Sequence, residues 1–124
     1  MKNTNQIAYL LAAVLLVVLD SVYLNLVKQY YNYQIKSVQG SDMKINLSAA
    51  ILCYVFLVFG INYFIIREKK SVLDAFLLGL TIYAVYELTS MALLKKWSWL
   101  TVIMDTTWGG ILFGLTTYLV YLIF

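Results

Sequence analysis

Histidine and proline are absent from this chain of 124 residues, and cysteine occurs once. Without histidine the chain cannot form a His-ligated haem, zinc or copper site, and it has no histidine to act as a catalytic base or triad member. The single Cys53 excludes an intrachain disulfide and a CxxC metal or redox pair. No metal site and no cofactor are therefore expected. Because proline is missing, the helices are expected to run without breaks.

Charged residues are also scarce, at 12% of the chain. They form no basic patch with the spacing of a nucleic-acid-binding surface, so no nucleic-acid partner is expected. No lysine lies deep in an apolar run, which disfavours a retinal Schiff base. No glycine-rich phosphate loop or activated serine nucleophile can be assembled. These absences favour a role other than catalysis, and no catalytic residue is assigned.

Hydrophobic residues, by contrast, make up 63% of the chain, and its mean hydropathy is +0.83. A soluble domain is usually about half apolar. The excess lies in four runs, each with at least the roughly 20 residues that a helix needs to cross a membrane. The sequence therefore predicts an all-α integral membrane protein, a four-helix bundle in one domain over residues 1–124. The expected spans are 7–27, 45–66, 72–94 and 98–124.

The connections between these runs differ in length. Residues 28–44 form the one long connection, which is expected to be an interfacial loop, whereas 67–71 and 95–99 are expected to be tight turns. The connections 28–44 and 95–99 contain tyrosine or tryptophan, which favour the headgroup level of a membrane. The residues expected at that level are Tyr30, Tyr31, Tyr33, Trp97 and Trp99.

The number of spans and the distribution of lysine and arginine bear on orientation. Four spans place both termini on the same side of the membrane. The basic residues divide almost evenly between the two sides, but those at 67–70 are the most densely spaced. Because basic residues near the span ends favour the cytoplasm, both termini are predicted to be cytoplasmic. The expected partners are the lipid bilayer and either further copies of the chain or another membrane protein.

Three acids, Asp20, Glu87 and Asp105, lie inside the apolar runs. Each is eight or nine positions from the lysine that borders its span on the side of the connection 28–44. At 1.5 Å per residue, each acid is therefore roughly 12 to 14 Å from that membrane face. Since successive helices alternate in direction, all three acids are expected in one layer. The pairs are Asp20 with Lys28, Glu87 with Lys95, and Asp105 with Lys96.

Polar and aromatic residues are expected at the same depth. Tyr23 and Trp108 each follow an acid by three positions, so each shares a helix face with it. Tyr83 and Ser90 flank Glu87 in the same way, and counting from Lys44 places Tyr54 in the layer. Buried hydroxyl groups need partners. These side chains are therefore expected to support the acids.

The acids are informative because a charged Asp near the bilayer centre costs about 3 kcal/mol on insertion scales. No lysine, arginine or histidine within the spans neutralises them. Two arrangements are physically reasonable. In one, some of the acids are protonated. In the other, the layer opens to water and holds a cation.

Three motifs of the chain resemble a family of small bacterial and viral membrane proteins known as domain of unknown function 2177. The family pattern is Leu-Asp-x-x-Trp-Leu, then Tyr-x-x-Tyr-Asp-Leu-Thr-Asn with a downstream Lys-x-Trp, then Asp-x-x-Trp-Gly. The matching stretches are LDSVYL (19–24), YAVYELTSMALLKKW (83–97) and DTTWGG (105–110). Here Tyr23 stands for Trp, Glu87 for Asp and Ser90 for Asn. The resemblance implies four spans and adds Tyr86, Thr89, Trp97 and Gly109 to the candidate residues.

The acid layer predicts a protein that handles protons or a small cation, as a channel or a proton-coupled carrier. Two alternatives remain open. One is a structural or assembly protein of a cellular or viral membrane, and the other is a membrane-embedded lipid-modifying enzyme or its accessory subunit. In every case, Tyr83 or Tyr86, and Tyr23 or Tyr54, are expected to hydrogen-bond an acid. A structural network of protonated acids is the simplest competing explanation of the layer.

Overall fold

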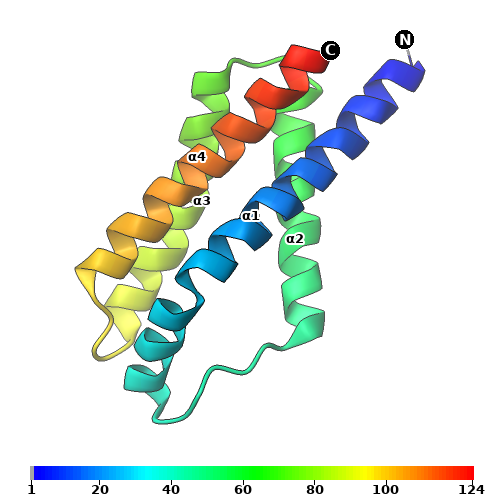
Figure 1. The fold of residues 1–124 in the computed structure, drawn as a ribbon. Coiled ribbons are helices and arrows are strands. Elements are labelled where there is room, and N and C mark those ends of the chain that lie inside the picture. The colour runs from blue at the N-terminus through cyan, green and yellow to red at the C-terminus, as the bar shows by residue number, and fades with distance from the viewer. Residues whose placement is uncertain (1) are drawn as a thin grey trace.

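In the computed structural model, the backbone is described for residues 2–124 and the side chains for residues 5–124. The chain forms four long helices, and Figure 1 shows its two ends at the same end of the bundle. Residues 2–124 contain no strand. The predicted all-α four-helix fold is confirmed. The helices are α1 (Lys2–Gln39), α2 (Leu47–Ile61), which continues through the π-helical turn η1 (Asn62–Ile66), α3 (Val72–Leu93) and α4 (Trp99–Ile123).

All four helices are long and apolar enough to cross a membrane. Helix α1 is longer than the predicted span, because residues 28–39 continue the helix. That stretch contains no glycine to interrupt it. The helix ends at Gly40, whose backbone has a φ of +79°, a left-handed conformation that glycine adopts easily. The connection expected over 28–44 is therefore limited to 40–46.

Short polar side chains mark where the other helices begin. The side chain of Asn46 accepts a hydrogen bond from the backbone N–H of Ala49 at the start of α2. Ser71 and Ser98 do the same for α3 and α4. Each cap satisfies a backbone N–H that the first helical turn leaves without a partner. These caps fix the turns 67–71 and 94–98.

Helices α3 and α4 pack closely because glycines lie between them. A Cβ on Gly79 would overlap the carbonyl oxygen of Gly109, and a Cβ on Gly109 would overlap the ring of Tyr83. A Cβ on Gly110 would lie 2.7 Å from the ring of Phe76. The small residues on these two helices thus allow close contact within one chain, as in other membrane helix pairs.

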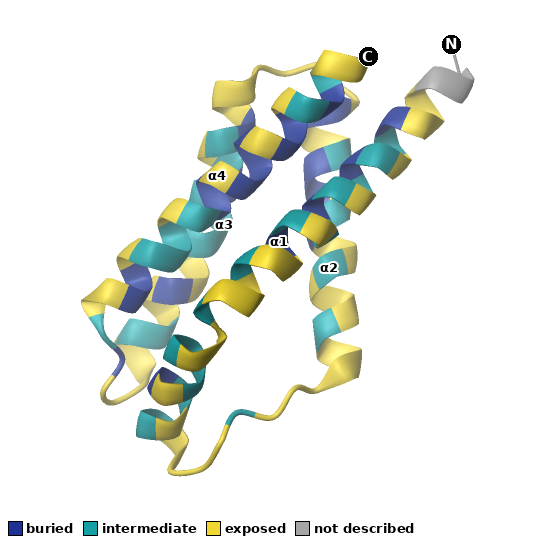
Figure 2. Ribbon diagram, viewed as in Figure 1, coloured by how far each residue is buried: buried dark blue, intermediate teal, exposed yellow. Residues whose placement is uncertain are grey.

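The apolar core lies at the end of the bundle that carries the termini. Leu16 of α1, Ile61 of α2, and Leu112 and Phe113 of α4 are fully buried there. Figure 2 shows that the half of α2 next to the connection 40–46 is mostly exposed. Figure 1 shows α1 inclined to α2, so that the two helices diverge toward this connection. The bundle is closed at one end and open at the other.

Candidate functional site

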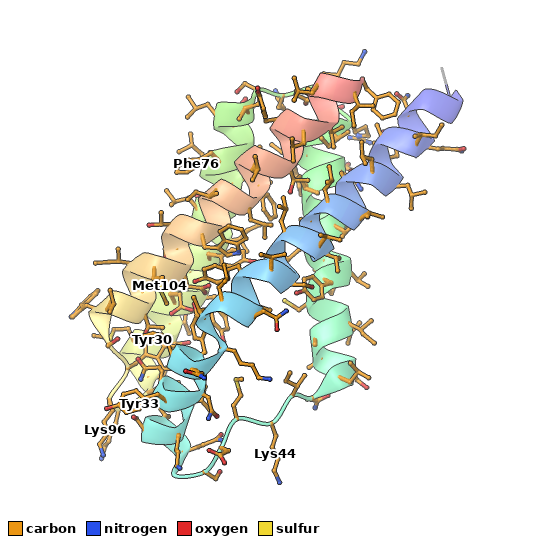
Figure 3. The ribbon with its side chains drawn as sticks, viewed as in Figure 1. Tyr30, Tyr33, Lys44, Phe76, Lys96 and Met104 are labelled. Carbon is orange, nitrogen blue, oxygen red and sulfur yellow. The ribbon has the colours of Figure 1, made fainter. Side chains whose placement is uncertain are left out.

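A cleft of about 540 Å³ lies between the diverging helices. All four helices contribute to its lining, together with the connection 40–46 and Trp97. Asp20, Glu87 and Asp105 all line it, so the structure brings the three predicted acids to one cavity. Figure 3 shows Lys44 and Lys96 at the end of the bundle away from the termini, the end at which the helices diverge.

Asp20 binds two aromatic donors from two other helices. The hydroxyl of Tyr54 on α2 donates to Oδ2 at 2.6 Å. The indole Nε1 of Trp108 on α4 donates to Oδ1 at 2.9 Å. The Asp20 side chain is only 7% exposed. The expected bond from Tyr54 is thus present, and one carboxyl group joins α1, α2 and α4.

Glu87 and Asp105 form the second part of the site. Glu87 is 1% exposed, and its Oε1 accepts a hydrogen bond from Nε1 of Trp97 at 3.0 Å. Asp105 on the adjacent helix α4 lines the same cleft. Two ionised carboxylates that line one cavity repel each other, which favours a proton on one of the two groups.

Aromatic side chains connect the two parts of the site. The ring of Tyr23 stacks on the ring of Trp108, with centroids 4.5 Å apart and planes 5° apart. The hydroxyl oxygen of Tyr23 lies 3.0 Å from that of Tyr31, which lines the cleft together with Asp105. Stacked and hydrogen-bonded aromatic rings have few alternative positions. These rings thus form a rigid frame beside the acids.

Four other candidate residues differ from what the sequence predicts. Tyr83 and Tyr86 line the cleft, but within residues 5–124 neither hydroxyl bonds an acid, so that expectation is wrong. The Tyr83 ring instead lies against the backbone of Gly109. Thr89 is exposed, and its hydroxyl donates to the carbonyl oxygen of Val85 at 2.6 Å. The Ser90 side chain forms no hydrogen bond to an acid in the described part of the chain.

Trp97, which was expected at the headgroup level, lies in the turn between α3 and α4. It is 6% exposed, and its indole binds Glu87. Trp97 is buried because its indole N–H finds an acceptor, Glu87, inside the bundle. Trp99, two residues later, is 60% exposed. The Lys-x-Trp motif marks Trp97, so the sequence did carry a signal for it.

The C-terminal part of α1 is fastened to the turn before α4, which the sequence did not predict. Gln34 is 4% exposed, and its Nε2 donates to the carbonyl oxygen of Lys96 at 2.7 Å. Its Oε1 accepts from the Ser98 backbone at 3.0 Å and from the Thr101 hydroxyl at 2.7 Å. The Tyr30 hydroxyl lies 2.7 Å from Oγ1 of Thr101. These bonds hold one wall of the cleft in place.

No ion pair neutralises the three acids in the described part of the chain, where salt bridges join Lys36 to Asp42 and Arg67 to Glu68. Across residues 5–124, no group of three acidic, cysteine or histidine side chains converges closely enough to hold a metal ion. The site therefore offers carboxylates and indole and phenol donors around a cavity, rather than a cage of ligands.

Residues 5–122 match the profile of a family described as "Predicted membrane protein (DUF2177)". The chain belongs to this family. Together with the four apolar helices, the match establishes an integral membrane protein. No curated protein and no solved structure matches the chain. In this DUF2177 protein the motifs of separate helices meet, since Asp20 binds Trp108, and Glu87 and Asp105 line the same cleft.

Proposed function

We propose that this protein is a proton-coupled carrier and that Glu87 and Asp105 exchange the transported proton. The presence of these two carboxyl groups in one cleft carries the proposal, since their mutual repulsion favours a proton that either group can release. Acids inside membrane spans often belong to proton relays. The cleft gives this pair a path to one end of the bundle.

The packing at the other end favours a carrier over a channel. Leu16, Ile61, Leu112 and Phe113 are fully buried between the cleft and the termini. A channel requires a continuous polar path, whereas a carrier opens to one side at a time. A chain of four helices encloses little space, so we propose that transport takes place in a dimer or larger assembly. We further propose that both termini are cytoplasmic, which directs the cleft to the opposite side.

Proton flux into liposomes that contain only this protein tests the proposal. A pH gradient across the vesicle should collapse faster with the wild-type chain than in empty vesicles. Glu87→Gln and Asp105→Asn should lower the rate roughly tenfold or more, because an amide cannot exchange a proton. Asp74→Asn removes an exposed acid in the first turn of α3, outside the cleft, and should leave the rate unchanged.

The same variants distinguish a carrier from a structural protein. In detergent, each amide variant should keep a free energy of unfolding close to that of the wild-type chain, because a neutral amide replaces a carboxyl group of similar shape. No wild-type flux in either orientation, together with unchanged stability of the variants, would refute the carrier and leave a structural or assembly role.

A further inference from the structure

We infer that the cleft binds an organic cation with a hydrophobic body, which is the substrate class that exchanges with the proton of Glu87 and Asp105. The inference rests on the proposed carrier function only for the exchange, because binding itself follows from the size, walls and charge of the cleft.

The size of the cleft favours a molecule over a bare ion. Small-molecule sites usually measure about 300–1,000 Å³. The cleft, at about 540 Å³, lies within this range. A metal ion would need oxygen ligands converging on one point, and no such group exists among residues 5–124. The cavity instead leaves room for a body that fills the space between α1 and α2.

The walls of the cleft favour an apolar body. Leu24 and Ile35 come from α1, Met43 and Ile45 from the connection 40–46, and Ala50 from α2. The rings of Tyr83 and Tyr86 on α3 face the same space. Apolar side chains with a few polar groups are typical of sites for small organic ligands, and aromatic faces attract cations.

The charge of the cleft favours a cation. Three carboxyl groups, those of Asp20, Glu87 and Asp105, line it, whereas Lys28, which is exposed, is the one basic residue in the lining. Even with one proton held by Glu87 or Asp105, the acidic groups outnumber the basic one. An anion would meet net repulsion, whereas a cation would be attracted.

The net charge of the cleft is unchanged when the cation binds and a proton is released. When the cation approaches Glu87 and Asp105, the proton held there leaves for water, so one positive charge replaces another. The other titratable groups that line the cleft are Asp20, Lys28, Tyr31, Tyr83 and Tyr86. If one proton is released, the affinity for the cation should rise by up to about tenfold per pH unit.

Two ions of the same shape and opposite charge test the inference. Tetraphenylphosphonium and tetraphenylborate would each be equilibrated by dialysis against the wild-type chain in detergent, with empty micelles as the blank. We expect saturable binding of the cation, release of a proton detected by a pH dye, and no binding of the anion above the blank. Glu87→Gln and Asp105→Asn should weaken cation binding roughly tenfold or more, and Asp74→Asn should not.

A variant that leaves the acids intact tests whether binding can be lost without misfolding. Met43→Trp places a larger side chain in the cleft from the connection 40–46, and it should weaken binding while helix content stays that of the wild-type chain. Equal binding of both ions, or cation binding that none of these variants lowers, would overturn the inference. Proton flux without cation binding would also overturn it while preserving the carrier. Cation binding with proton release but no flux would support the inference and refute the carrier.

Discussion

At the scale of single residues, two of the three acids of the cleft accept hydrogen bonds from aromatic donors. Asp20 binds Trp108 and Tyr54, and Glu87 binds Trp97. An indole N–H does not titrate at any pH that the protein meets, so it fixes a carboxyl group without neutralising it. The acids can therefore gain or lose a proton while the surrounding bonds stay in place.

Replacement of Trp97 tests this arrangement. Trp97→Phe keeps an aromatic ring but removes the donor to Glu87, leaving a buried oxygen without that partner. We expect the free energy of unfolding in detergent to fall by about 1–2 kcal/mol. Trp99→Phe is the matched control, because Trp99 is exposed and should change stability by less than about 0.5 kcal/mol. Equal losses for the two variants would contradict a specific role for Trp97.

The sequence predicted part of this site. Depth counting identified Asp20, Glu87 and Asp105, since position along a helix follows from rise per residue. It did not identify Tyr31 or Gln34, because residues 28–39 were expected to be a loop, in which spacing carries no information about faces. It also did not identify the position of the Tyr83 ring, since that depends on packing against Gly109 rather than on depth.

At the scale of elements, α3 and α4 form the most closely packed pair, and α1 contacts them less extensively. Hydropathy predicted all four helices, because a span must be apolar along its length. It did not predict the length of α1. Hydropathy indicates where the hydrocarbon layer ends. A helix can continue beyond that point until a capping residue or a left-handed residue stops it, and α1 stops at Gly40.

Glycine substitutions test the α3–α4 contact. Gly109→Ala introduces a methyl group that overlaps the Tyr83 ring, so the helices must separate. We expect a loss of about 1–3 kcal/mol in the free energy of unfolding. Gly60→Ala in α2 is the control, because a Cβ there has no atom within 4 Å and should stabilise the helix by about 0.5–1 kcal/mol. A Gly109→Ala chain as stable as wild type would show that the contact is not tight.

At the scale of the whole molecule, the connections divide between two ends. The connections 40–46 and 94–98 lie at one end with the cleft, and the turn 67–71 lies at the other end with the termini. In a membrane these ends should face opposite aqueous compartments. The side that each end faces decides to which compartment the cleft opens.

Single cysteines test this orientation. In a Cys53→Ala background, Ser41→Cys should react with a membrane-impermeant maleimide added outside intact cells. Glu68→Cys should react only after permeabilisation, because the cluster of basic residues at 67–70 favours the cytoplasm. Both residues are exposed, so the difference reports sidedness rather than burial. The reverse pattern would place the termini outside.

Helix α1 also makes the protein sensitive to membrane thickness. Its apolar residues 7–27 extend about 32 Å, close to the thickness of a typical hydrocarbon layer, and the helix leans away from α2. A thicker bilayer favours a less tilted α1, which brings it toward α2 and narrows the cleft between them, whereas a thinner bilayer widens it. Cation binding measured in vesicles of increasing acyl-chain length should therefore weaken progressively. Lipid length would then act on this protein as a regulator, without any headgroup being recognised.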